Sequence, residues 1–240
     1  MDLTNFKIEI KKMLKDNEIE LNENQIEKFY KYMSNLKEWN EKINLTAIKE
    51  DKEIILKHFI DSLKISEYLN NNKILDIGSG AGFPGIPLKI KNDKLEITLI
   101  DSINKKINFI KDTINKLELK NIEAIHIRAE ELAQEKEYRE QFDTVVSRAV
   151  ANLTTLVEYM IPFVKINGIC ICMKGPNFEK ELEDAKYAIE KLGGEIEKII
   201  NYRINEENER NIVIIRKKKH TEQTYPRKQG KPLKEPLLKK

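Results

Sequence analysis

Glycines at every second position after an apolar strand are spaced to hold a nucleoside-bearing ligand. The strand is the run 74–77, and Asp76 lies near its carboxyl end. The glycines that follow it are Gly78, Gly80 and Gly82. They keep side chains out of a turn that leads into a helix near Pro84, so the backbone can approach a ligand closely. This arrangement indicates binding of a nucleotide or nucleoside beside the start of a helix.

The next apolar strand, residues 95–101, also ends in a carboxylate, that of Asp101. An acid at the carboxyl end of the second strand can form hydrogen bonds to both hydroxyls of a ribose. Asp101 and the glycine turn together predict a socket for a dinucleotide or for S-adenosylmethionine, with Asp76, Gly78 and Gly80 among its binding residues. A turn that merely links a strand to a helix is the simpler alternative.

The spacing of the glycines favours S-adenosylmethionine. A Gly-x-Gly-x-x-Gly dinucleotide fingerprint that starts at Gly78 needs a third glycine where the chain has Phe83. The same fingerprint started at Gly80 is met by Gly82 and Gly85, but it begins two residues after the first glycine of the turn. Alternating glycines after an acidic residue resemble the first motif of class I S-adenosylmethionine-dependent methyltransferases.

Strands and helices alternate from residue 73 onward and must position this socket. We expect strands at 73–77, 95–100, 122–127, 143–147, 168–174, 195–204 and 210–216, and helices near 84–91, 103–118, 151–162 and 177–192. This alternation predicts an α/β fold with a Rossmann-like, doubly wound and mainly parallel sheet of seven strands. The last two strands have a short Asn/Glu-rich connection and should form a hairpin, so the final strand runs antiparallel.

Three parts of the chain are expected. Residues 1–70 form an N-terminal helical cap with helices at 4–15, 22–43 and 49–69, packed against the sheet domain. Residues 71–217 form the S-adenosylmethionine-binding domain. Residues 218–240 mix prolines and lysines and are expected to be a basic, flexible tail.

Two basic residues end strands at the predicted ligand-binding edge. Arg148 follows the fourth strand and can bind either the methionine carboxylate or a substrate phosphate. Lys174 ends the fifth strand and either meets a substrate phosphate or base, or is an ordinary solvated lysine. The loop after Arg148 has no Asn/Asp-Pro-Pro-aromatic tetrapeptide and no Pro-Cys nucleophile, which disfavours methylation of exocyclic amines and of pyrimidine C5.

Charge is distributed unevenly along the chain. Residues 216–240 hold ten basic and two acidic residues, whereas the rest of the chain holds 33 basic and 38 acidic residues. A basic tail on an acidic body points to a polyanionic partner, although a tail that only aids solubility has the same composition. We expect the tail to bind the phosphates of such a partner without recognising its sequence and without changing cofactor affinity.

Other compartments and other kinds of site are disfavoured. No apolar window of about 18 residues is present, and the first 15 residues contain no apolar signal core. We therefore expect a cytoplasmic protein that does not enter a membrane. We also expect the protein to be a monomer. Cys170 and Cys172 have no second pair to complete a zinc site, so no metal is expected and both should be buried, reduced thiols.

Several motifs together resemble the glucose-inhibited division protein B family, the bacterial guanine-N7 methyltransferases of 16S ribosomal RNA. They are Ile-Leu-Asp-Ile-Gly-Ser-Gly-Ala-Gly-Phe-Pro-Gly-Ile-Pro (74–87), Asn-Leu-Thr-Ala (44–47), His-Phe-Ile-Asp-Ser-Leu (58–63), Leu-Ile-Asp-Ser (99–102), Ser-Arg-Ala-Val-Ala (147–151) and Met-Lys-Gly (173–175). The resemblance covers about residues 25–217. It implies that Gly78, Phe83, Ala129, Glu130 and Arg148 bind S-adenosylmethionine.

The resemblance also implies a target, guanine 527 in the 530 loop of 16S ribosomal RNA, met either as free RNA or in the assembling small subunit. Guanine N7 carries a lone pair and no proton, so it can attack the methyl group in line without a general base. Arg148 and Lys174 would then only position the reactants. His58 and Asp61 either shape the target pocket or form a structural pair, and Arg227 and Lys228, in a Tyr-Pro-Arg-Lys motif, are expected to contact RNA.

Two other functions would use the same sequence features. A small-molecule methyltransferase would share the cofactor socket, but small apolar acceptors favour a closed apolar pocket. A non-catalytic RNA-binding module would keep the basic tail, but it would not need the glycine turn or Asp101.

Overall fold

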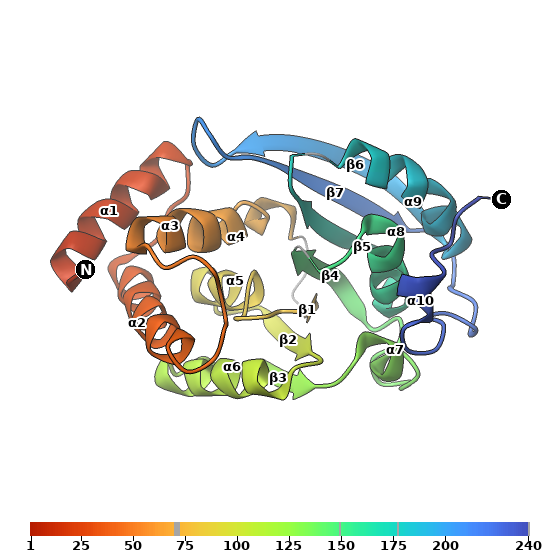
Figure 1. The fold of residues 1–240 in the computed structure, drawn as a ribbon, viewed down its shortest axis with the longest axis horizontal. Helices are drawn as coiled ribbons and strands as arrows, with labels where there is room; N and C mark the ends of the chain where they lie inside the picture. Colours follow the sequence, from red (N-terminus) through yellow and green to blue (C-terminus); the bar gives the residue numbers. More distant parts are fainter. Residues whose placement is uncertain (70–72, 149, 177, 240) are drawn as a thin grey trace.

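The computed structural model describes residues 1–69, 73–148, 150–176 and 178–239, which form a seven-stranded sheet flanked by helices (Figure 1). The strands are β1 (Lys73–Ile77), β2 (Glu96–Asp101), β3 (Ile122–His126), β4 (Phe142–Arg148), β5 (Val164–Lys174), β6 (Gly194–Arg203) and β7 (Glu209–Lys217). Their order in the sheet is β3-β2-β1-β4-β5-β7-β6, and β7 is antiparallel to both of its neighbours while β1 to β5 are parallel. The predicted doubly wound sheet with an antiparallel last strand is confirmed.

Helices cover both faces of the sheet. They are α1 (Leu3–Asp16), α2 (Glu23–Asn40), α3 (Asp51–Ile54), α4 (Asp61–Leu63), α5 (Gly85–Lys91), α6 (Asn104–Lys116), α7 (Ala129–Leu132), α8 (Leu153–Met160), α9 (Glu179–Lys191) and α10 (Lys231–Lys234), with a π-helical turn at Ile55–Ile60 and 3-10 turns at Ser66–Tyr68 and Ile161–Phe163. Figure 1 shows α1 to α6 at one side of the molecule and α7 to α10 at the other. Among the described residues, no helix is both long and apolar enough to span a membrane.

The central strands are buried on both faces because each face meets a separate apolar cluster. Ile74 of β1 joins the cluster under α1, α2 and α6, whereas Leu75 and Ile77 join the cluster under α8 and α9. Side chains alternate along a strand, so β1 supplies both layers and is almost continuously apolar. The socket therefore stands on the most buried part of the sheet.

The N-terminal helices share one apolar core with the sheet domain. Phe6, Phe29 and Phe59 are buried in the same cluster as Ile74. The helix expected at 49–69 is instead four short pieces: α3, the π-helical turn, α4 and a 3-10 turn. π-helical turns are rare and concentrate at functional sites. The expected boundary between residues 70 and 71 lies outside the described residues.

The C-terminal segment is packed against the body, not detached as its composition suggested. Tyr225 and Leu237 lie against the apolar cluster of α8 and α9. The guanidinium of Arg227 pairs with the Glu158 carboxylate at 2.7 Å, and the Glu158 side chain is 1% exposed. A buried carboxylate requires a partner of opposite charge, and this requirement holds the segment in place.

Candidate active site

A cavity of about 460 Å³ lies at the carboxyl ends of β1, β2 and β4. Most of the residues predicted to bind cofactor line it: Gly78, Gly80, Phe83, Asp101, Ala129, Glu130 and Arg148. His58 from the N-terminal cap lines it too. The strand-end rule for open α/β sheets therefore located the cavity correctly.

The glycine turn has the backbone that its sequence demands. Gly78 and Gly80 have φ of 66° and 60°, in the left-handed region that residues with a Cβ rarely adopt. The amides of Gly78 and Ser79 both donate to the Ile100 carbonyl, at 2.9 and 3.1 Å. A Cβ at position 78 would lie 2.5 Å from a methyl carbon of Val150, so a side chain there would be strained and would displace Val150. The turn is thereby fixed to β2 and presents bare backbone to the cavity.

Asp101 lines the cavity and is held in one orientation by the backbone. One carboxylate oxygen accepts the Gly80 amide at 3.0 Å, and the other accepts the Ile103 amide at 2.8 Å. Each carboxylate oxygen has a second lone pair, so both can still accept a hydroxyl hydrogen. The residues present thus fit the ribose of S-adenosylmethionine.

We expect Asp101→Ala to weaken S-adenosylmethionine binding by about 1–3 kcal/mol, the size of hydrogen bonds to a charged group. Isothermal calorimetry measures the loss, and the melting temperature reports whether the variant is folded. Glu96, an exposed acid at the far end of the same strand, provides the control, and Glu96→Ala should leave the affinity unchanged. If folded Asp101→Ala binds S-adenosylmethionine with unaltered affinity, Asp101 is not a cofactor-binding residue.

Asp76, which is expected to bind cofactor, is not among the residues that line the cavity. It is fully buried, and its carboxylate accepts the Gly85 amide at 2.8 Å. Its other oxygen has no partner among the described residues. Burial raises the pKa of Asp76 to about 7. The side chain acts behind the turn, where it fixes the start of α5.

Arg148 extends from the end of β4 to the cap. Its Nη1 donates to the Lys57 carbonyl at 2.9 Å and to Asp61 Oδ2 at 3.2 Å. Its Nη2 faces His58 Nδ1 at 3.1 Å, and the guanidinium carbon lies 4.9 Å from the centre of the Phe83 ring. The π-helical turn and α4 thus supply three acceptors to a single arginine. This explains why cap residues line the cavity.

His58 is held as a neutral imidazole. Its Nδ1 accepts from Arg148, so its Nε2 carries the hydrogen and donates to Thr46 Oγ1 at 2.8 Å. The ring also stacks on Phe83 with centroids 4.5 Å apart. Burial and the positive charge of Arg148 lower the pKa of His58 to about 3. His58 therefore cannot act as a general base at neutral pH, because its lone pair is already bound.

This lowered pKa predicts a pH dependence of stability. The unfolded chain binds a proton at His58 below about pH 6.5, whereas the folded chain resists it down to about pH 3. Stability should therefore fall as pH drops from about 6.5 towards about 3, and His58 should contribute no pH dependence above about pH 7. Melting temperatures measured from mildly acidic to neutral pH should show a shallower acid decline for His58→Gln than for the wild type. Exposed His126 provides the control, and curves that stay parallel for His58→Gln would contradict a neutral His58.

A second depression, of about 340 Å³, adjoins the first and shares His58 and Arg148 with it. The depression is also lined by four charged residues, Lys57, Asp61, Lys174 and Arg210. Asp61 accepts the Tyr202 hydroxyl at 2.8 Å and is 4% exposed. His58 and Asp61 therefore both contact Arg148. Each is a structural partner of that arginine and also lines the depression.

Two basic residues expected to meet RNA are already paired. Lys174 is 8% exposed, donates to the Ala151 carbonyl at 2.6 Å and pairs with Glu181 at 2.7 Å. It is therefore not a solvated lysine, and its charge is largely compensated. Arg227 is similarly bound to Glu158, whereas Lys228 is exposed.

Several lining residues were not anticipated from the sequence. They are Thr46, Ile103, Val150, Tyr159 and Arg210. Ile103 and Val150 lie two residues after the ends of β2 and β4, so the strand-end rule could have found them. Tyr159 and Arg210 come from α8 and β7, and no local pattern marks them.

A left-handed glycine turn, a carboxylate at the tip of β2 and this strand order define the class I S-adenosylmethionine-dependent methyltransferase fold. Solved structures agree. The M. jannaschii protein TYW2, solved in complex with AdoMet, superposes with a TM-score of 0.53 and 17% identity over 71% of this chain and 77% of that one. A SAM-dependent methyltransferase from Aquifex aeolicus superposes with a TM-score of 0.51 and 18% identity over 69% and 93%.

Sequence relatives specify the family. The model of the family GidB, rRNA small subunit methyltransferase G, matches residues 25–216. The ribosomal RNA small subunit methyltransferase G of Clostridium tetani is 50% identical over 91% of this chain and 93% of its own length, and that of Acetivibrio thermocellus is 48% identical over 91% of each. The chain belongs to the rRNA small subunit methyltransferase G family. It is an S-adenosylmethionine-dependent rRNA methyltransferase, as its motifs predicted.

Proposed function

We propose that this enzyme methylates N7 of a guanine in 16S ribosomal RNA, namely guanine 527 in the 530 loop, by direct in-line attack. The observation that carries the mechanism is the state of His58. It is the one imidazole that lines the cavity among the described residues, and its Nδ1 is occupied by Arg148. A nucleophile that must lose a proton would need a base here, whereas guanine N7 needs none.

The cofactor would be held by residues at the ends of four strands, β1 to β4. We propose that Asp101 binds the ribose, that Ala129 and Glu130 border the adenine, and that Gly78, Phe83 and Arg148 border the methionine side. S-adenosylmethionine supplies a methyl group on a positively charged sulfur. The chain's contribution is to orient the reactants, because proximity and alignment account for much of such a rate.

The target base would enter the depression beside Arg148. RNA is read at loops and at bases turned out of the stack, and such a base needs a recess next to the methyl donor. The depression of about 340 Å³ shares a wall with the cofactor cavity, and Lys57 and Arg210 on its lining can meet RNA phosphates. We propose that a cytoplasmic monomer uses this arrangement on free RNA or on the assembling small subunit.

Mapping 7-methylguanine in small-subunit RNA tests the proposal. RNA from cells with and without the gene is compared by mass mapping, and loss of one 7-methylguanine at position 527 is expected. Purified enzyme is then assayed with free 16S RNA, with small-subunit particles and with small acceptors. Loss of methylation at another base, or transfer only to small acceptors, would overturn the assignment.

A further inference from the structure

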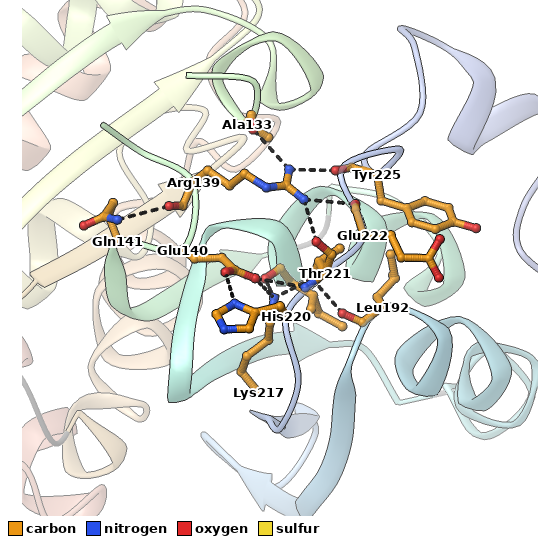
Figure 2. Close-up of polar contacts among 11 residues, drawn as sticks. Ala133, Arg139, Glu140, Gln141, Leu192, Lys217, His220, Thr221, Glu222 and Tyr225 are labelled. Carbon is orange, nitrogen blue, oxygen red and sulfur yellow. Dashed lines mark hydrogen bonds and ion pairs between the residues drawn. The ribbon is translucent and has the colours of Figure 1, made fainter. Parts of the chain in front are cut away.

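An arginine clamp fixes the C-terminal segment to the loop after α7 (Figure 2). Arg139, 9% exposed, donates from Nη1 to the carbonyls of Ala133 at 3.2 Å and Tyr225 at 2.7 Å. Its Nη2 donates to the carbonyls of Thr221 and Glu222, both at 3.0 Å. A guanidinium that binds four backbone carbonyls selects one path for the chain, because its donors lie in a fixed plane.

Neighbouring charges reinforce this clamp. Glu140 accepts the Thr221 amide at 2.9 Å and pairs with the Lys217 ammonium at 3.0 Å (Figure 2). The Lys217 side chain is 1% exposed and that of Glu140 is 18% exposed, so the pair is largely shielded from solvent. Residues 217–225 are thereby positioned by partners that lie about 80 residues earlier in the chain.

The segment then passes behind the cofactor cavity. The Arg227 backbone amide and Nε both donate to Glu158 Oε1, at 2.8 and 2.9 Å, and Nη2 donates to Oε2 at 2.7 Å. Glu158 directly precedes Tyr159, which lines the cavity. Burial and the carboxylate of Glu130 raise the pKa of Tyr159 to about 12, which keeps its hydroxyl protonated.

The segment also touches a cavity residue directly. The Gly230 amide donates to Glu130 Oε1 at 3.3 Å. Glu130 is 9% exposed and lines the cavity from α7. The segment therefore contacts the region of α7 at two points: through Arg139 at the Ala133 carbonyl, and through Gly230 at the Glu130 carboxylate.

We infer that residues 221–230 are a positioning element of the cofactor site, which orients the Glu130 carboxylate towards the adenine end of the cavity. The inference rests on the proposed role of Glu130 in binding cofactor. It reverses the expectation that the tail acts on RNA alone. Because Gly230 makes this contact through its backbone amide, the backbone conformation of Gly230 determines how the Glu130 carboxylate is oriented.

Gly230 offers a matched pair of full-length variants. Its φ is 75°, and a Cβ there would meet no atom within 4 Å, so a side chain is disfavoured by backbone strain alone. Valine disfavours this left-handed backbone and should move the amide away from Glu130, whereas asparagine tolerates it. Gly230→Val should raise the dissociation constant for S-adenosylmethionine about tenfold, the loss expected for a hydrogen bond to a charged group, and Gly230→Asn should retain the wild-type value.

Three further readouts separate positioning from simple destabilisation. Turnover at saturating cofactor should be unchanged in Gly230→Val, and its melting temperature should remain well above the assay temperature. In a Glu130→Gln background, Gly230→Val should add no further loss of affinity. If Glu130→Gln binds normally, the proposed role of Glu130 fails; if Glu130→Gln weakens binding and Gly230→Val does not, the positioning element is refuted.

Discussion

Arg148→Ala is expected to lower the rate of methyl transfer at saturating cofactor and RNA about 100-fold, the size of effect seen when reacting groups are misplaced by about 1 Å. Arg148 joins three parts of the site. It contacts Lys57, His58 and Asp61 of the cap, lies on the Phe83 ring and lines both the cofactor cavity and the adjoining depression. Without it, the cap loses these contacts to β4, and the wall between the proposed sites of methyl donor and target base can shift.

Single-turnover kinetics with RNA measures this effect, and Arg148→Lys refines it. A lysine supplies one compact charge and cannot contact His58 and the Lys57 carbonyl from two nitrogens in one plane. We therefore expect lysine to restore little activity. Arg203→Ala, at an exposed arginine on β6, is the control and should behave as the wild type. Full activity of Arg148→Lys would show that charge alone is required.

The strands and the cavity could be predicted because their signals are local. An apolar run bounded by glycine or charge reads as a buried strand, and parallel strands place their carboxyl ends at one edge. Asp101 and Arg148 end such runs, so both could be assigned to the cavity without knowing any long-range contact. The hairpin of β6 and β7 was predictable for the same reason, from a short polar connection.

Asp76 shows where a local signal is insufficient. A carboxylate near the end of β1 can face either side of the sheet, and side chains alternate along the strand. Asp76 shares its face with Ile74, whose side chain joins the cluster under the cap, and it meets the Gly85 amide at the start of α5. The motif singled out this position but did not reveal that Asp76 supports the turn from behind.

Contacts between distant segments could not be read from the sequence. Asp61 meets Tyr202 across 141 residues, and Arg139 meets Tyr225 across 86. The tail's lysines and prolines have the composition of a flexible segment, but its path is set by a few buried charges elsewhere. Average composition does not show that Arg227 will pair with Glu158. A single buried ion pair can fix the path of a segment whose other charges are solvated.

Gly80→Asn is expected to abolish measurable S-adenosylmethionine binding, which means at least about a 100-fold loss, while the protein stays folded. Gly80 has φ of 60°, a backbone that asparagine tolerates better than other residues with a Cβ. A Cβ there would meet only the Gly78 carbonyl oxygen, at 3.9 Å. The protein therefore has room for the side chain, and because Gly80 lines the cavity, that room is the space in which the cofactor would lie if it binds as proposed.

Calorimetry with S-adenosylmethionine, together with the melting temperature, measures the two effects separately. Gly230→Asn introduces the same residue at another left-handed glycine with open space around it, and should keep both affinity and stability. This comparison matters because it removes the strain of asparagine in a left-handed backbone as an explanation. A folded Gly80→Asn variant that binds S-adenosylmethionine normally would place the cofactor away from the glycine turn. The assignments of Asp101 and Glu130 would then fail with it, since both depend on a ligand that crosses the turn between β1 and α5.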